Sequence, residues 1–305
     1  MTTLLLFALA AAAPIGPAPA PAPLYGFWGL DGFWNVRDLT SLRTRIRMGL
    51  VQMATTDPRS ALLDIFPAMK AAGVKVSLRL TGGPKNYTLP NGDFSLPAWK
   101  FHLEKWHNTG IEAYISDGTV VGHMLLDDIK NYTGRDPTAA ELDEMARYSH
   151  ELFPEVMAFV RERATAMPVP DSGKYEHVDA IVNQYKALDG DVATFAMVEA
   201  NAAARLDLGV INGLNIANGG DGSSRQPGWA KGRWAMSAEE IRTYGKVMAG
   251  VPTCGMFLNW EYDGTERWVD GSVGSTWFDR PDVEAALAEV GDVVSRHPYV
   301  KLTRR

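Results

Sequence analysis

The chain has 305 residues, of which 46% are hydrophobic and 22% are charged. This composition excludes a disordered or fibrous protein, and the length allows one barrel-sized domain or two small ones. The formal net charge of −6 comes from interspersed residues of both signs, without a Lys/Arg cluster. Nucleic acid and anionic membranes are therefore excluded as expected partners, and uncharged or cationic ligands fit better.

The N-terminal segment has the pattern of an export signal. The apolar run from Leu4 to Ala13 is too short to span a bilayer, and small residues after it offer an Ala-x-Ala type of cleavage site. We expect residues 1–23 to be a signal peptide and a Pro/Ala-rich linker, residues 24–305 to form a single domain, and the protein to be secreted, periplasmic or at the cell surface. Because no Lys or Arg precedes the run, an apolar tail ahead of a rigid tether is the alternative.

From Leu24 onward, the chain alternates apolar strands with amphipathic helices. Seven expected strands are apolar runs bounded by glycine, proline or polar residues, over 25–30, 50–54, 74–80, 120–128, 178–185, 210–217 and 253–260. A short proline-broken run at 166–170 is expected to be the fifth of eight strands. It could instead be a loop, which would leave seven strands.

Three of the intervening helices carry signals at their N-termini. Asp57-Pro58 precedes a helix over 60–72, and the capping boxes begin at Thr138 and Ser237. The helix after Thr138 is expected to reach Arg163, and further helices are expected over 96–106, 192–206 and 282–296. This alternation predicts an α/β protein with a (β/α)8 TIM barrel. The chain has neither a Gly-x-Gly-x-x-Gly after the first strand nor a Walker loop, which argues against a nucleotide-binding fold.

Barrels of this type assemble their sites at the carboxyl ends of the strands. Carboxylates, amides and aromatic rings gather there, a mixture that suits carbohydrate: polar groups bind hydroxyls, rings stack on sugars, and acetal cleavage needs two carboxyl groups. Asp127, Asp128 and Glu261 are the catalytic candidates. The candidates for substrate binding are Trp28, Asp31, Arg79, Asn183, Tyr185, Asn215, Trp260 and Tyr262.

Two strand ends, Leu125-Leu126-Asp127-Asp128 and Asn259-Trp260-Glu261-Tyr262, resemble those of the (β/α)8 glycoside hydrolase superfamily. The main retaining clan has Asn-Glu on strand four and Glu on strand seven. This chain has Asp-Asp and Asn215-Ile-Ala-Asn218 there, so that retaining mechanism does not carry over. Trp260 matches a ring that commonly floors the sugar site. The resemblance implies a secreted O-glycosyl hydrolase.

The acidic candidates also have structural interpretations. Adjacent Asp residues after a strand often form a cap or turn, and only one of the two can readily point into the barrel mouth because side chains alternate. Glu261 could pair with Arg79 or Lys130, and Arg79 is expected to be the counter-ion of one carboxylate. The alternative function is a barrel that only binds glycan or scaffolds a surface assembly, with its carboxylates held in salt bridges.

Strands four and eight lie opposite one another in an eight-stranded barrel, so carboxyl groups at their ends are expected to be widely separated. This spacing favours an inverting hydrolase, in which Asp127 or Asp128 shares the acid and base roles with Glu261. We expect the more buried member to be the acid, and the rings flanking Glu261 favour that residue. His123 and Cys254 read as packed core residues. No His/Asp cluster has the spacing of a zinc site, so we expect no metal. We also expect no other cofactor, a carbohydrate substrate and a monomer.

Overall fold

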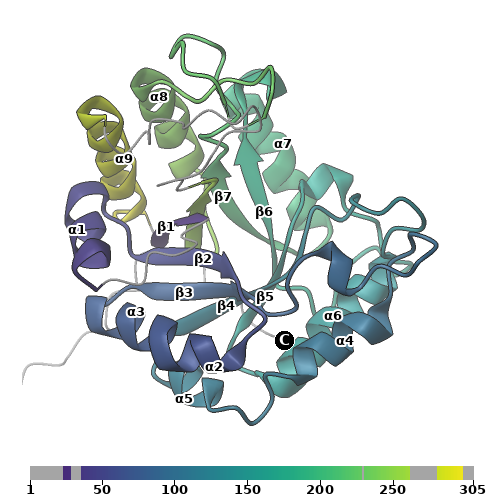
Figure 1. The fold of residues 1–305 in the computed structure, drawn as a ribbon. Helices are drawn as coiled ribbons and strands as arrows, with labels where there is room; N and C mark the ends of the chain where they lie inside the picture. Colours follow the sequence, from purple (N-terminus) through teal and green to yellow (C-terminus); the bar gives the residue numbers. More distant parts are fainter. Residues whose placement is uncertain (1–22, 29–35, 229, 262–279, 298–305) are drawn as a thin grey trace, which may run out of the picture.

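The computed structural model describes residues 23–28, 36–228, 230–261 and 280–297, so the expected export signal and the candidates Asp31 and Tyr262 lie outside the described residues. Eight parallel strands form a closed barrel in chain order, with β8 paired to β1 (Figure 1). The predicted (β/α)8 fold is confirmed. Among the described residues, none of the helices is both long and apolar enough to cross a membrane.

The strands are short and almost fully buried, as parallel strands covered on both faces require. Their bounds are β1 Leu24–Trp28, β2 Leu50–Ala54, β3 Lys75–Arg79, β4 Val120–Asp127, β5 Met157–Arg161, β6 Ala180–Tyr185, β7 Gly209–Leu214 and β8 Met256–Asn259. Seven of them fall within the predicted runs or differ by one residue at an end, because near-continuous apolar runs are a strong signal for such strands.

The fifth strand is where the sequence prediction was wrong. β5 is Met157–Arg161 and not 166–170, which follows the 3-10 turn η3, Ala164–Ala166. The preceding helix ends at Leu152 and does not continue to Arg163, since Phe153 leaves helical geometry at φ −135 and ψ 74 ahead of a proline. The fifth strand is therefore present, but it begins nine residues earlier in the chain than expected.

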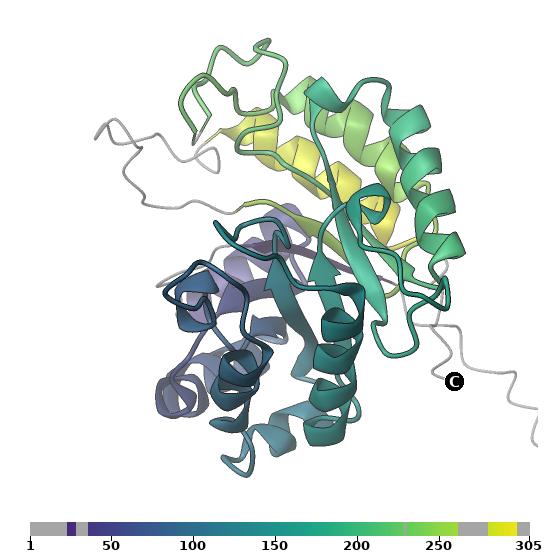
Figure 2. The ribbon, with the colours of Figure 1, turned by 90° about the vertical axis from the view of Figure 1, so that its right-hand side faces the viewer.

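Helices surround the barrel on all sides (Figure 1). The predicted caps at Asp57, Thr138 and Ser237 are confirmed, with a complete capping box at each of the last two. The helices are α1 Val36–Ile46, α2 Pro58–Ser60, the π-helical turn η1 Ala61–Ile65, α3 Phe66–Ala72, α4 Leu96–Glu104, α5 Ile111–Ser116, α6 Ala139–Leu152, α7 Val192–Arg205, α8 Ala238–Ala249 and α9 Pro281–Val294. Two short 3-10 turns, η2 Pro84–Asn86 and η4 Ala187–Asp189, follow β3 and β6. Figure 2 shows the green and yellow helices of the C-terminal half together on one side and the blue helices on the other.

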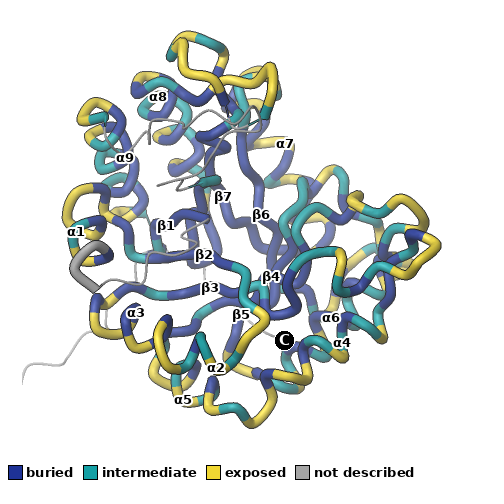
Figure 3. The backbone as a smooth tube through the Cα atoms, viewed as in Figure 1, coloured by how far each residue is buried: buried dark blue, intermediate teal, exposed yellow. Residues whose placement is uncertain are grey.

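The barrel has two buried apolar clusters, and the cluster to which a strand residue belongs shows which way its side chain points. A smaller apolar cluster that includes Met124, Phe159 and Val182 fills the interior of the barrel, and a larger cluster lies between the strands and the helices. The strands are accordingly buried along their length, while the helices expose their outer faces (Figure 3). Since side chains alternate along a strand, neighbours of an interior residue face the helices.

Candidate active site

Ion pairs join the ends of β3, β4 and β5. Asp127 and Arg161 are register partners on β4 and β5. Asp127 accepts a hydrogen bond from Nη1 of Arg79 at 2.9 Å through Oδ2, and a bond from Nε of Arg161 through Oδ1. Both of its oxygens are thus held by guanidinium groups, and the predicted role of Arg79 as a counter-ion is confirmed.

Asp128 reaches the same arginine by a different route. Its backbone adopts φ 55, in the left-handed region, and its N–H donates to the Arg161 carbonyl at 3.1 Å. This turn breaks the alternation of the strand, so Asp128 also pairs with Arg161, through Nη2. The expectation that only one of the two carboxylates can turn to the mouth is therefore wrong. The side chain of Asp128 is 45% exposed, against 24% for Asp127.

The aromatic candidates border this cluster. Trp28, at the end of β1, packs on the interior cluster, and the guanidinium of Arg79 lies 5.5 Å from its ring centroid. Trp260 is half-buried, packs against both apolar clusters and forms a bridge with Asn215. Oδ1 of Asn215 accepts the N–H of Asn218 at 3.0 Å, which turns the chain after β7. These placements leave their predicted binding roles as predictions.

Two of the predicted binding residues face away from the mouth. Tyr185 is buried, donates its hydroxyl to the Gly190 carbonyl at 2.5 Å and packs edge-on against Phe195 and Tyr244 of α7 and α8. Asn183 is on the same side of β6, because it alternates with the interior-facing Val182. The prediction that Asn183 and Tyr185 bind substrate is wrong for this geometric reason.

The residue between them, Gln184, is the one from β6 that reaches the mouth. It lines a pocket of ≈ 120 Å³ at the ends of β4, β5 and β6. The pocket has one apolar wall residue, Val182, and is otherwise polar, with cations and carboxyl groups in equal number: Arg161, Arg163, Lys186, Asp128, Glu162 and Asp189. A pocket of balanced charge and high polarity suits a hydroxyl-rich neutral ligand.

Glu162 is the functional candidate that sequence analysis missed. It follows Arg161 at the end of β5, and its Oε1 accepts the N–H of Arg163 at 2.9 Å. Burial raises the pKa of its carboxyl group and is the largest influence; the backbone N–H of Arg163 opposes it, Asp128 raises the pKa further, and Arg161 and Lys130 lower it. The misplaced strand had hidden this residue, because residues 157–163 were assigned to a helix.

Glu261 follows Trp260 directly after β8 and is half-buried. Of the two partners suggested for it, Arg79 binds Asp127. The peptide bond between Trp260 and Glu261 is cis. The catalytic role of Glu261, on the side of the barrel opposite β4, stays a prediction.

Comparisons with known proteins bear on the fold. No protein-family model matches the sequence, and no curated protein matches it significantly. Solved structures do match: the endo-1,4-beta-mannanase from Rhizomucor miehei is 12% identical with a TM-score of 0.55, over 92% of this chain and 99% of that one. A cellulase in an inhibitor complex is 12% identical with a TM-score of 0.53, over 89% and 93%.

The catalytic domain of the major endoglucanase from Xanthomonas campestris pv. campestris is 11% identical with a TM-score of 0.50, over 90% of this chain and 96% of that one. The chain therefore shares the (β/α)8 barrel fold of these three structures. At these identities the likeness establishes the fold, and the chemistry has to be argued from the side chains of the mouth.

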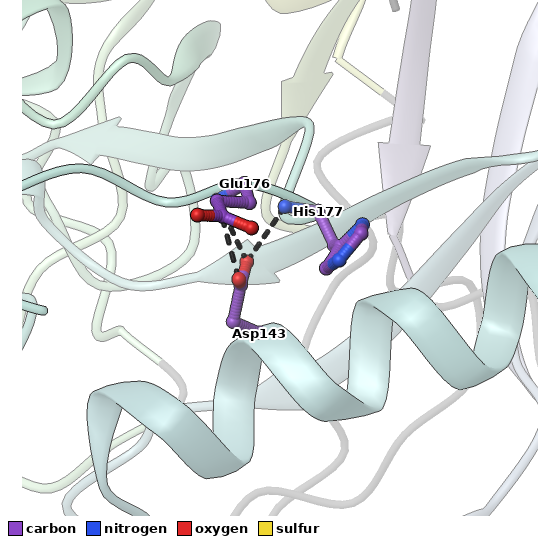
Figure 4. A group of neighbouring side chains, drawn as sticks. All are labelled: Asp143, Glu176 and His177. Carbon is purple, nitrogen blue, oxygen red and sulfur yellow. Dashed lines mark hydrogen bonds between the residues drawn. The ribbon is translucent and has the colours of Figure 1, made fainter. Parts of the chain in front are cut away.

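Outside the mouth of the barrel, one group in the described part of the chain has the spacing of metal ligands. The ligand atoms of Asp143, Glu176 and His177 lie within 4.8 Å of one another. The Asp143 carboxylate, however, accepts the backbone N–H groups of Glu176 and His177 at 3.1 and 2.7 Å (Figure 4). It also accepts the N–H of Val178 at 3.1 Å. Its role is to hold the loop that precedes β6.

The two core residues singled out from the sequence are buried, as expected. His123 contacts the hydroxyl of Ser149 through Nδ1 at 2.7 Å and stacks on Trp99, and burial lowers its pKa to about 3. Burial also raises the pKa of the Cys254 thiol well above its ordinary value. A neutral imidazole and an un-ionised thiol act here as packing groups.

Proposed function

We propose that this protein is a glycoside hydrolase that cleaves poly- or oligosaccharides at the mouth of its barrel. The observation that carries the proposal is the polar pocket at the ends of β4 to β6, where carboxyl groups and the buried amide of Gln184 come together beside the ion-paired arginines. Trp28 and Trp260, at the ends of β1 and β8, supply the rings on which a pyranose would stack.

The proposed reaction uses two carboxyl groups on opposite sides of the mouth. Glu261, after β8, is one of them, and the other comes from the side of β4 and β5. β4 and β8 are four steps apart in the closed barrel, and this opposite placement supports a wide spacing of the two groups. We therefore propose an inverting reaction, in which the attacking water stands between an acid and a base.

Reducing-end release from a panel of plant, fungal and bacterial polysaccharides tests the proposal. The wild-type protein should release sugar from at least one polysaccharide, and Glu261→Gln should reduce the rate by about 100-fold or more, the usual contribution of an acid or base. Asp171→Asn, at an exposed turn before β6, is the matched control and should keep the wild-type rate. A wild-type protein that releases nothing from any polysaccharide refutes the proposal.

The second candidate function is glycan binding without catalysis, and the double ion pair of Asp127 favours it. A carboxylate with both oxygens bound to guanidinium groups cannot donate a proton to a ligand. Affinity electrophoresis in gels that contain each polysaccharide separates the two: retardation without sugar release would support a pure binder.

We also propose that the protein is exported as a monomer and meets its carbohydrate outside the cytoplasm. The apolar segment ahead of the Pro/Ala repeat supports this proposal. N-terminal sequencing of protein recovered from the host's periplasm or medium should give a chain that begins after Ala13. A product that keeps Met1 and stays in the cytoplasm would contradict export.

A further inference from the structure

The buried amide of Gln184 has open hydrogen-bonding capacity at the pocket that it lines. The residue is 8% exposed, and among the described residues neither Nε2 nor Oε1 has a hydrogen-bond partner. It alternates with Ile181 and Tyr185, which face the helices, so its amide points into the pocket that it lines. A donor and an acceptor left open side by side match the hydroxyl groups of a sugar.

Glu162 lies in the same pocket on the neighbouring strand. It differs from the two carboxylates of β4, which are both bound by the Arg161 guanidinium. Of the cations that share its pocket, Arg163 is engaged elsewhere, with Asp189 at 3.1 Å and Glu199 at 3.8 Å and with its guanidinium over the Phe195 ring. Glu162 thus contacts Arg163 through the backbone N–H, at 2.9 Å, while the guanidinium of Arg163 lies with other groups.

The charged groups around Glu162 come from three strand ends. Asp128 on the β4 side favours the protonated carboxyl, Arg161 and Lys130 favour the carboxylate, and Lys186 and Asp189 close the β6 side of the pocket. Burial is the largest influence, and together with Asp128 it raises the pKa of Glu162. This is the condition that a proton donor requires near neutral pH.

We propose that Glu162 is the proton donor of the glycosidic cleavage and that Gln184 binds a hydroxyl group of the same sugar. The inference rests on the proposed function: it places the acid at the end of β5 and gives Glu261, which the sequence favoured as the acid, the role of the base. Asp128 then acts as a positioning residue, whose charge keeps the proton on Glu162.

The step balances with water as the second reactant. The Glu162 carboxyl gives its proton to the glycosidic oxygen while the bond from that oxygen to the anomeric carbon breaks, and the bonding pair stays on the oxygen, which leaves as an alcohol. The oxygen of the attacking water bonds to the anomeric carbon, and its proton passes to the carboxylate of Glu261. Exchange with solvent then restores both carboxyl groups.

The test compares two substrates that differ in their need for an acid. One is the polysaccharide that the wild-type protein cleaves best, and the other is the 2,4-dinitrophenyl glycoside of the same sugar, whose leaving group departs without protonation. Glu162→Gln should lose about 100-fold or more on the polysaccharide and stay within a few-fold of wild type on the aryl glycoside. It should also lose the alkaline limb of the pH–rate profile.

Two further variants make the result specific. Glu155→Gln, at an exposed position ahead of the same strand, is the matched control and should behave as wild type. Asp128→Asn should move the alkaline limb of the pH–rate profile for polysaccharide cleavage to lower pH, because the loss of its charge lowers the pKa of Glu162.

Several outcomes would overturn the inference while the proposed function stands. Glu162→Gln could cleave the polysaccharide as fast as Glu155→Gln, or it could lose equally on both substrates, as a misfolded variant or a base variant would. Asp128→Asn could instead show the leaving-group dependence expected for Glu162→Gln. A wild-type protein that cleaves no polysaccharide removes the proposed function itself, and thermal denaturation of each variant separates misfolding from chemistry.

Discussion

Replacing Gln184 with methionine should make the protein more stable and a poorer enzyme at once. Methionine has a similar length and no strong hydrogen-bonding group, so the substitution removes the two buried polar atoms that lack partners among the described residues. If Gln184 had a purely structural role, its replacement would remove a stabilising hydrogen bond and lower the stability of the protein. A gain in stability together with a loss of activity therefore identifies a ligand-binding amide.

The expected changes in unfolding free energy and in KM follow from the two polar amide atoms that Gln184→Met removes. An unsatisfied buried polar group costs roughly 1–3 kcal/mol, and water that enters the open pocket offsets part of this cost. We therefore expect Gln184→Met to raise the free energy of unfolding by about 1 kcal/mol, which in a domain of this size shifts Tm upward by roughly 2–4 °C. Two lost hydrogen bonds to the sugar, at about 1 kcal/mol each, should raise KM by roughly ten- to thirtyfold.

Asn183→Leu is the matched control for this prediction. Both amide atoms of Asn183 also lack partners among the described residues, but its side chain faces the helices, next in sequence to Gln184. Thermal denaturation and steady-state kinetics of both variants form the assay. Asn183→Leu should gain stability with an unchanged KM. If Gln184→Met loses stability, or if both variants change KM equally, the argument for a ligand-facing amide fails.

Three further predictions concern charge and stacking. Burial lowers the pKa of His123 to about 3. The stability of the neutral form is therefore present above pH 6.5, and the free energy of unfolding falls by about 1.4 kcal/mol per pH unit as the pH drops towards 3. His123→Asn should remove this pH dependence in denaturant titrations. The raised pKa of Glu162 acts in the opposite direction: its contribution to stability is present below pH 4.5 and is lost as the pH rises through the folded pKa. The stability of Glu162→Gln relative to wild type should therefore increase from pH 4 to pH 8. The same stability difference between variant and wild type at the two pH values would contradict the shift. Trp260→Ala should weaken glycan binding by on the order of 1–3 kcal/mol in calorimetry, and unchanged affinity would count against a stacking role.

The barrel was predictable from the sequence because its signals are local. Parallel strands buried on both faces are nearly continuous apolar runs, and the capping boxes at Thr138 and Ser237 mark helix starts within four residues. The fifth strand failed for a related reason. Met157–Arg161 continues the apolar pattern of the helix before it, and the proline after Phe153 was the signal that the helix had ended.

The site was less predictable, because it depends on the face of each strand. A shift of one residue reverses the direction of every side chain, and the sequence of β6 offers Asn183, Gln184 and Tyr185 with equal plausibility as ligands. Only the closed barrel shows that the middle residue faces the interior. Likewise, the pairing of Asp127 with Arg161 requires the register between β4 and β5, which follows from no local pattern.

The arginines occupy the two aspartates at the end of β4 and position one of them beside the next strand. Arg79 and Arg161 approach Asp127 from the strands on either side, and Arg161 also holds Asp128. These ion pairs occupy both carboxylates and fix Asp128 beside the next strand end. A carboxyl group placed there, partly buried and next to a fixed negative charge, retains its proton more strongly than an isolated one. Glu162 occupies that position, so the ion pairs that occupy the two aspartates also create the environment for an acid on β5.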